Sequence, residues 1–168
     1  MTTIPGVEVM ALERFSDERG SFTEIMRASI SRRDFLQSSH SRSAAGVLRG
    51  LHYHRVQTDL WYLAAGRARI ALVDLRAGEE GLQTMTWVAD ADEPATILIP
   101  PGVAHGYLAL TDIDMLYLTT TEFEPGDEFG IAWNDPGLAI PWEVPEPLLS
   151  DRDRSNAAIS WHEIAPFS

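Results

Sequence analysis

Short segments in which apolar side chains recur or alternate are spaced along the chain, with turn-forming residues between them. The clearest is Arg67–Asp74, where apolar side chains at every second position alternate with Arg67 and Arg69. Side chains two residues apart on a strand point to the same face, so this pattern predicts a half-buried β-strand. Gly66, which directly precedes it, suits the turn of a hairpin. The other predicted strands are Val7–Ala11, Ser21–Met26, Val47–His54, Leu60–Ala65, Thr84–Val88, Thr96–Ile99, Gly106–Leu110 and Met115–Thr121.

The spacing of these segments predicts an all-β fold, a sandwich or barrel formed by a single domain over residues 1–168. Gly, Pro, Asp or Asn stands at most junctions, where tight turns favour them. One short helix is predicted at Ser31–Gln37, with Ser31 as its N-cap. The segment from Asp135 onward is rich in Pro and Trp and lacks a strong period. We expect it to wrap around the barrel, with a helical turn near Ser150–Asp153.

The composition of the chain says more about its possible partners than about its fold. The net charge of −12 argues against nucleic acid or a membrane surface as a partner. The absence of cysteine excludes a disulfide framework and a thiolate nucleophile. We find neither a signal-peptide pattern nor an apolar run near the roughly 20 residues of a membrane span, so we expect a cytoplasmic protein. All 13 basic residues are arginine, whose planar group suits bidentate contacts with phosphate.

Three histidines and one acidic residue form the first candidate site. His52 and His54 lie two residues apart on a predicted strand, so both can face a barrel interior. Asp59 stands near the start of the next strand, and His105 follows a Pro-Gly turn. Three imidazoles and a carboxylate suit iron, manganese, zinc or nickel. The spacing resembles the two signature motifs of the cupin barrel, although Asp59 replaces the usual Glu. One hypothesis is therefore a metal-dependent cupin enzyme with these four residues as ligands.

A more specific resemblance extends over ordered blocks from about residue 5 to 155. The blocks are Asp17-Glu-Arg-Gly-Ser-Phe-Thr-Glu24, Gly46-Val-Leu-Arg-Gly-Leu-His-Tyr53, Val73-Asp-Leu-Arg76, Ile99-Pro-Pro-Gly-Val-Ala-His-Gly-Tyr107, Leu116-Tyr117, Trp133-Asn-Asp-Pro136 and Leu149-Ser-Asp-Arg-Asp153. They resemble the dTDP-4-dehydrorhamnose 3,5-epimerase family of the cupin superfamily. The resemblance implies a jelly-roll cupin barrel, a nucleotide-sugar substrate and a homodimer with exchanged N-terminal strands. It also implies a reaction that uses no cofactor and no metal.

The family's chemistry assigns catalytic roles, by resemblance, to three residues. His52 matches the base, which removes a proton from a carbon next to a C4 ketone. A histidine suits this task because its pKa lies near neutrality. Asp153 matches the carboxylate that fixes the tautomer of the base and stabilises its protonated form. Tyr117 matches the acid that returns a proton to the opposite face, which completes an epimerisation at C3, C5 or both.

Five further residues match positions of the family that contact the substrate. Arg49 matches a residue near the ketone oxygen, where a fixed cation would stabilise developing negative charge. His105 matches a histidine of the pocket. Arg19, Phe22 and Glu24 match the segment that reaches the nucleotide of the neighbouring subunit. There Arg19 would hold phosphate, and Phe22 would stack on the base or pack near it.

Three positions in the pocket depart from the family's pattern. Asp59 stands where the family usually has a lysine near the enolate oxygen, and Tyr62 stands where an arginine often contacts phosphate. We keep both as candidate substrate-binding residues. His54 replaces an uncharged side chain such as Gln. A carboxylate beside an oxyanion is repulsive. Either Asp59 pairs with Arg49, or it is protonated, or it holds a metal, or the substrate or the number of inverted carbons differs.

A nucleotide-sugar epimerase is the favoured function, because Arg49, Tyr117 and Asp153 would be coincidental in a purely metal-dependent cupin. The metal-dependent cupin enzyme is the first alternative. The two hypotheses conflict at His52, which cannot readily be both a metal ligand and a free base. A sugar-nucleotide binding protein without catalysis is the second alternative, because the family's lysine is missing.

Overall fold

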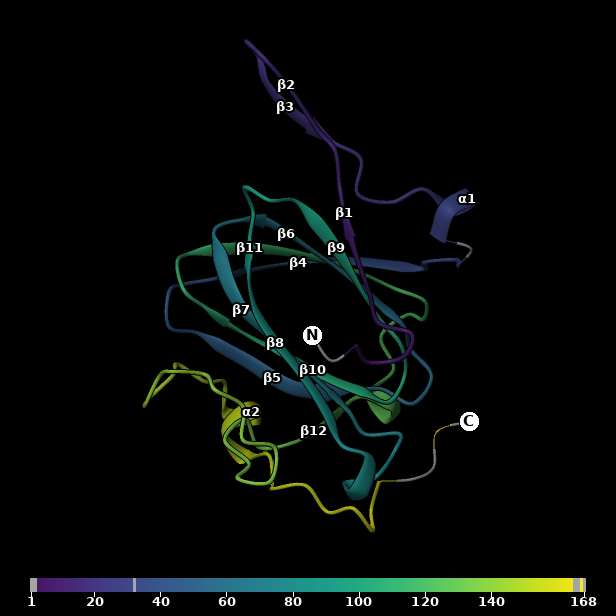
Figure 1. The fold of residues 1–168 in the computed structure, drawn as a ribbon, viewed down its shortest axis with the longest axis vertical. Helices are drawn as coiled ribbons and strands as arrows, with labels where there is room; N and C mark the ends of the chain where they lie inside the picture. The colour runs from purple at the N-terminus through teal and green to yellow at the C-terminus, as the bar shows by residue number, and fades with distance from the viewer. Residues whose placement is uncertain (1–2, 32, 165–166, 168) are drawn as a thin grey trace.

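The computed structural model describes residues 3–31, 33–164 and 167. These residues form two five-stranded antiparallel sheets that curve around a common interior (Figure 1). The first sheet has the strand order β1 (Glu8–Ala11), β9 (Ala95–Ile99), β6 (Asp59–Ala65), β11 (Ile113–Thr119) and β4 (Gln37–Ser43). The second has the order β12 (Phe129–Gly130), β5 (Leu48–Tyr53), β10 (Val103–Ala109), β7 (Arg67–Asp74) and β8 (Gln83–Asp90). The predicted all-β class is confirmed.

The remaining elements are short and lie outside the two sheets. They are the hairpin strands β2 (Arg14–Asp17) and β3 (Gly20–Thr23), the helices α1 (Ala28–Ser31) and α2 (Asp151–Ser155), and 3-10 turns at Glu79–Gly81 and Pro125–Asp127. Among the described residues, no helix has the length and apolar character needed to cross a membrane.

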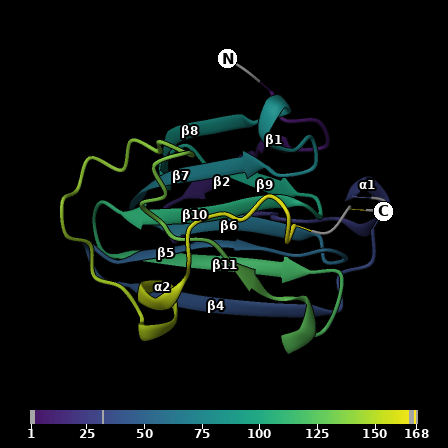
Figure 2. The same cartoon turned by 90° about the horizontal axis from the view of Figure 1, so that it is seen from below.

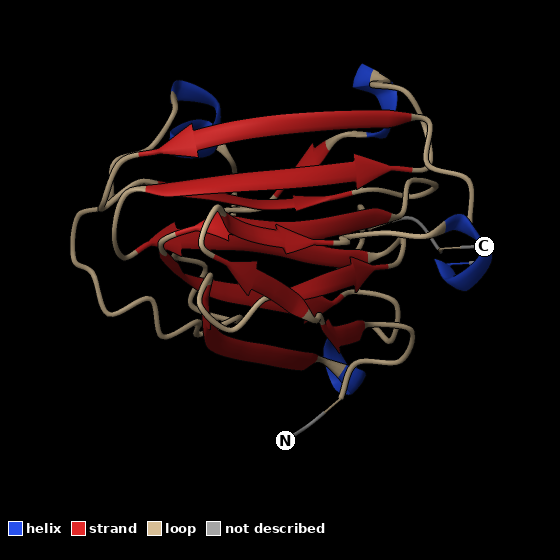
Figure 3. Ribbon diagram, turned by 90° about the horizontal axis from the view of Figure 1, so that it is seen from above, coloured by secondary structure: helices blue, strands red, loops and turns tan. Residues whose placement is uncertain are grey.

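The chain passes repeatedly from one sheet to the other, which brings candidate residues from distant segments together. Strands β5, β6 and β7 alternate between the sheets, and so do β9, β10 and β11. Figures 2 and 3 show the resulting stack of strands. Within the second sheet, His105 of β10 pairs in register with His52 of β5. Within the first, Tyr117 of β11 pairs with Trp61 of β6.

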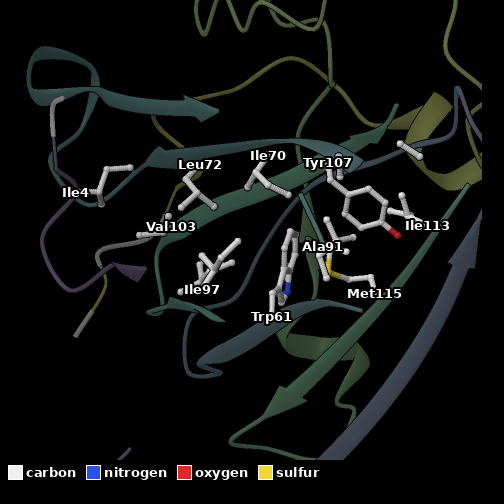
Figure 4. Packing of buried hydrophobic residues seen from close by; sticks show 14 residues of the cluster. Ile4, Trp61, Ile70, Leu72, Ala91, Ile97, Val103, Tyr107, Ile113 and Met115 are labelled. Carbon is white, nitrogen blue, oxygen red and sulfur yellow. The ribbon is translucent and has the colours of Figure 1, made fainter. Parts of the chain in front are cut away.

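One apolar cluster fills part of the space between the sheets. Trp61 and Ile97 of the first sheet meet Ile70, Leu72 and Tyr107 of the second (Figure 4). These residues follow the predicted period of two, because inward-facing side chains alternate along each strand. Each fully buried large aliphatic side chain contributes about 1.5–3 kcal/mol to folding.

A second apolar cluster covers the outer face of the second sheet. Leu51 and Val73 are fully buried there and pack with Leu138 and Trp142 of the C-terminal segment. Strand β7 is therefore buried on both faces over most of its length, rather than half-buried as its pattern predicts. The expected wrapping of the C-terminal segment around the barrel accounts for this difference.

The N-terminal hairpin β2–β3 projects away from the barrel (Figure 1). Phe15 and Phe22 are cross-strand partners on this hairpin. They are 54% and 65% exposed, which is unusual for large apolar side chains. The hairpin thus has little packing against the barrel of its own chain.

The predicted helix at Ser31–Gln37 is wrong. Residue 32 lies outside the described residues, but the helix α1 ends at Ser31, and Gln37 already begins the strand β4. Strand β4 was not predicted because its sequence, Gln-Ser-Ser-His-Ser-Arg-Ser, has no apolar face. The helical turn predicted near residue 150 is confirmed as α2, with Ser150 as its N-cap.

Candidate active site

A cavity of about 510 Å3 collects most of the candidate residues. Its wall includes side chains from β5 and β10 of the second sheet and from β6 and β11 of the first, together with α2. A ligand in the cavity would therefore meet groups that come from opposite sheets. The predicted site residues on its wall are Arg49, His52, His54, Asp59, His105, Tyr117 and Asp153.

His52 and Asp153 are hydrogen bonded although they lie 101 residues apart in the sequence. The His52 Nε2 atom is 2.6 Å from Asp153 Oδ1, and the two side chains are 22% and 4% exposed. Asp153 lies in the first turn of α2, where its N–H donates to the capping hydroxyl of Ser150. Burial by itself would raise the pKa of Asp153, but the hydrogen bond and charge of His52, together with smaller contributions from Ser150 and Gly50, lower it. Asp153 is therefore ionised at neutral pH.

This carboxylate fixes the tautomer of His52. A carboxylate oxygen accepts hydrogen bonds, so the ring proton lies on Nε2 and the lone pair lies on Nδ1. Nδ1 can then accept a proton, and the negative charge of Asp153 stabilises the imidazolium that results. The pair has the arrangement of a general base with an orienting carboxylate.

Tyr117 reaches the cavity from the other sheet. Burial raises the pKa of its phenol, while a hydrogen bond with Ser41 and the charge of Arg49 act in the opposite direction. The phenol is thus protonated at neutral pH and can donate a proton. Arg49 is held by Ser43, which accepts from its Nε at 3.0 Å. The hydroxyl of Tyr107 lies within 3.1 Å of the same serine, so Arg49 and Tyr107 belong to one polar network around Ser43.

His105 and Asp59 form a second histidine–carboxylate pair with different geometry. The His105 Nε2 atom is 3.7 Å from Asp59 Oδ2, and both side chains are almost fully buried. His105 donates through Nδ1 to the Val103 carbonyl at 3.0 Å. Burial lowers the pKa of His105 to about 4, although the charge of Asp59 opposes this. Asp59 accepts from Gln57 Nε2 at 2.7 Å and from Trp61 Nε1 at 3.2 Å.

His54 lies beside this second pair. Its Nδ1 donates to the Asp127 carbonyl at 2.7 Å, and its Nε2 lies 3.2 Å from the amide nitrogen of Gln57. Ligand atoms of His54, Asp59 and His105 all lie within 4.8 Å of one another. Of the four ligands in the metal hypothesis, the structure brings these three together, while His52 is held by Asp153 instead.

One expectation for Asp59, a pairing with Arg49, can be compared with its contacts, and the described contacts do not include this pair. Gln57 and Trp61 donate to its carboxylate, whereas Arg49 donates to Ser43. Gln57 and Trp61 were not among the candidate residues. Both lie two residues from Asp59, so extending the period of two through the start of β6 would have placed all three on one face.

Four predicted substrate-binding residues do not line the cavity of this chain. Tyr62 is buried, but it alternates with the residues of β6 that face the cavity and therefore points to the other side of the sheet. Arg19 and Phe22 lie on the projecting β2–β3 hairpin, and Glu24 follows it directly. Arg19 and Glu24 each form an ion pair with a residue close by in the sequence.

Fold and cavity together define a class of protein: a jelly-roll barrel of the cupin type with acid–base groups between its sheets. Residues 1–160 match the family model described as dTDP-4-dehydrorhamnose 3,5-epimerase. The chain therefore belongs to the dTDP-4-dehydrorhamnose 3,5-epimerase family and is an enzyme of the isomerase class. The family resemblance and the cupin fold predicted from the sequence are confirmed.

Individual relatives agree with this assignment. The chain is 39% identical over 147 residues to the spore coat polysaccharide biosynthesis protein SpsL of Bacillus subtilis. The matched region covers 84% of this chain and 97% of that protein. The chain is 37% identical over 170 residues to the dTDP-4-dehydrorhamnose 3,5-epimerase of Pseudomonas aeruginosa, with 94% and 93% covered. It is also similar to the structure of the dTDP-6-deoxy-D-glucose-3,5-epimerase from Legionella pneumophila in complex with dTDP-4-keto-L-rhamnose. That match has a TM-score of 0.86 and 31% identity, and it covers 98% of this chain and 92% of the other.

Proposed function

We propose that this enzyme inverts C3, C5 or both carbons of a dTDP-linked 4-keto-6-deoxy sugar. The observation that carries the proposal is the His52–Asp153 pair, which lines the same cavity as Tyr117 of the opposite sheet. The ligand in the Legionella relative, dTDP-4-keto-L-rhamnose, belongs to this class of sugar.

The chemistry follows from the positions of these groups. His52 takes the proton from a carbon next to the C4 ketone, and the ketone becomes an enolate. The imidazolium is stabilised by Asp153, and Arg49 offers a cation to the enolate oxygen. Tyr117 then returns a proton. Because His52 and Tyr117 come from opposite sheets, a sugar ring between them presents opposite faces to base and acid, which is the condition for inversion.

Solvent exchange tests the proposal directly. A 4-keto-6-deoxy sugar linked to dTDP is incubated with the enzyme in deuterated water, and the label at C3 and C5 is followed by NMR. We expect deuterium at each carbon that is inverted. Binding of the nucleotide sugar without label at either carbon would contradict the proposal and favour a binding protein without catalysis.

We further infer that the enzyme is a homodimer in which the β2–β3 hairpin reaches the cavity of the partner. The hairpin projects from its own barrel (Figure 1). Its side chains Phe15 and Phe22 are exposed. A diphosphate also needs cations, and on the wall of the cavity Arg152 is already paired with Glu128. Arg19 at the end of the hairpin would supply another. In this arrangement Arg19, Phe22 and Glu24 contact the nucleotide in the neighbouring subunit.

Subunit complementation tests this arrangement. Arg19→Ala should raise KM, and His52→Asn should abolish turnover. In a mixed dimer of the two variants, one cavity would combine an intact His52 with an intact Arg19 from the other subunit. We expect such dimers to have the wild-type KM and about half the wild-type kcat. If Arg19 acted within its own chain, the mixed dimer would keep the raised KM of Arg19→Ala. The cytoplasmic location expected from the sequence stays a prediction.

A further inference from the structure

A polar cluster beside the His52–Asp153 pair has no part in the proton transfers described above. It consists of His54, Asp59 and His105, which occupy the wall of the same cavity. One ligand atom from each lies within 4.8 Å of the others, and none of the three residues is more than 9% exposed. Two imidazoles and a carboxylate at this separation form a donor set used for transition metals.

The hydrogen bonds that the two rings donate place the lone pair of each ring on Nε2. Each Nδ1 donates to a backbone carbonyl, that of Asp127 for His54 and that of Val103 for His105. In a neutral imidazole the lone pair then lies on Nε2. Metal-binding histidines commonly have this arrangement, in which the second ring nitrogen is anchored and the ring orientation is fixed.

The cluster also contains an excess of acceptors over donors. His105 Nε2 and Asp59 Oδ2 face one another at 3.7 Å, although in this tautomer both are acceptors. The side-chain amide of Gln57 lies between the other two members and donates both to Asp59 Oδ1 and towards His54 Nε2. The partly positive amide thus stands where a cation would satisfy the same lone pairs.

We propose that His54 Nε2, a carboxylate oxygen of Asp59 and His105 Nε2 bind a divalent transition-metal ion such as zinc or cobalt. Bonds of about 2.0–2.2 Å place ligand atoms roughly 3–4 Å apart around one ion. The separation between His105 and Asp59 is already in this range, and small side-chain rotations close the rest. Gln57 turns aside when the ion enters.

The site differs from the four-ligand hypothesis, because His52 stays paired with Asp153 and remains available as a base. His105 and His52 are neighbours in the β10–β5 register, so an ion on the cluster would lie close to the reacting part of a bound sugar. It would restore a positive charge beside the acidic Asp59 and stabilise an enolate oxygen. This role rests on the proposed function, and it revises the expectation of a reaction without metal.

Cobalt titration tests the site without reference to turnover. Untagged full-length protein is stripped with a chelator and titrated with Co2+, while visible absorption reports coordination and elemental analysis gives stoichiometry. We expect one Co2+ per chain. His54→Gln and Asp59→Asn should each weaken binding by at least about tenfold. His40→Gln is the matched control, because His40 forms a histidine–carboxylate pair with Asp114 on the exposed surface. It should bind Co2+ like the wild type.

The outcomes separate this inference from the proposed function. No stoichiometric Co2+, or equal affinity in folded His54→Gln and wild type, would overturn the metal site even if solvent exchange continues. Stoichiometric Co2+ that is lost in the ligand variants supports the site, even if the sugar is not labelled. His52→Asn should bind Co2+ normally but lose exchange. For the wild type, we expect exchange at least about tenfold faster after loading than after stripping. An equal rate would overturn the role assigned to the ion.

Discussion

Two histidine–carboxylate pairs share one cavity and differ in where the proton lies. His52 donates directly to Asp153 over 2.6 Å and is 22% exposed. His105 faces Asp59 at 3.7 Å, donates instead to the Val103 carbonyl, and burial lowers its pKa to about 4. The same two residue types thus place the free lone pair on Nδ1 of His52 in one pair and on Nε2 of His105 in the other. The partners of the second ring nitrogen and the depth of burial make the difference.

Loss of the base itself should have the largest effect. His52→Asn is expected to slow deuterium exchange by about 1,000-fold, because a positioned general base contributes roughly 10²–10⁴-fold. The melting temperature should change little, since His52 is partly exposed. His40→Gln, which removes a surface histidine of a similar pair, serves as the control. Exchange at the wild-type rate would remove His52 from its role.

Loss of the orienting charge should come next. Asp153→Asn keeps the size of the side chain but removes the negative charge that fixes the tautomer of His52, and we expect exchange to fall by about 100-fold. The measurement is the exchange rate at saturating substrate. An unchanged rate would show that the charge of Asp153 does not activate His52, and the two histidine–carboxylate pairs would then not differ in this respect.

Asp153→Asn also tests how the His52–Asp153 pair contributes to the free energy of unfolding at different pH values. The pKa of Asp153 in the folded chain lies below its ordinary value of 3.8. Its contribution to stability is therefore fully present above that value and is lost as the pH falls through the folded pKa. The difference in free energy of unfolding between wild type and Asp153→Asn should begin to shrink as the pH falls below about 5 and should keep shrinking through the folded pKa, as measured by urea unfolding. A constant difference would contradict this linkage.

Tyr117→Phe should separate proton removal from proton return. We expect epimerised product to fall by about 10–100-fold, because the donor is lost. Wash-in of deuterium without inversion should persist, since His52 and Asp153 remain intact. Product analysis by NMR alongside mass spectrometry gives both rates. Equal loss of both would indicate that Tyr117 is needed for binding rather than for reprotonation.

Gln57→Ala should have the smallest effect and should be confined to the second pair. In metal-free protein it removes donors to Asp59 and His54, so we expect a loss of about 1 kcal/mol in the free energy of unfolding. Deuterium exchange should stay close to the wild-type rate. In the described part of the chain, Gln57 makes no hydrogen bond with His52 or Asp153. A large fall in exchange would show that the two pairs are coupled.

Much of the fold was predictable because the period of two is a local property. Each of the nine predicted strand segments overlaps a strand of the structure. Strand β4 escaped prediction because a strand paired through its backbone need not carry apolar side chains. The burial of both faces of β7 could not be predicted from its own residues, since the C-terminal segment that covers it lies far along the chain.

The site was predictable only where short spacings carried the information. The spacing of His52 and His54 and the Pro-Gly turn before His105 can each be recognised within a few consecutive residues. The contact of His52 with Asp153 spans 101 residues and could be expected only through resemblance to a family. The hydrogen bonds that divide the histidines into two groups involve backbone carbonyls, and no residue pattern reveals those partners.

Asp153 follows all the described strands in the sequence. A ribosome therefore synthesises β1 to β12 before it adds Asp153. His52 is made well before the carboxylate with which it pairs. The His52–Asp153 pair forms only when the C-terminal segment has packed on the outer face of the second sheet. A clipped chain without this segment would lose the carboxylate beside His52 and would expose apolar residues such as Leu51 and Val73.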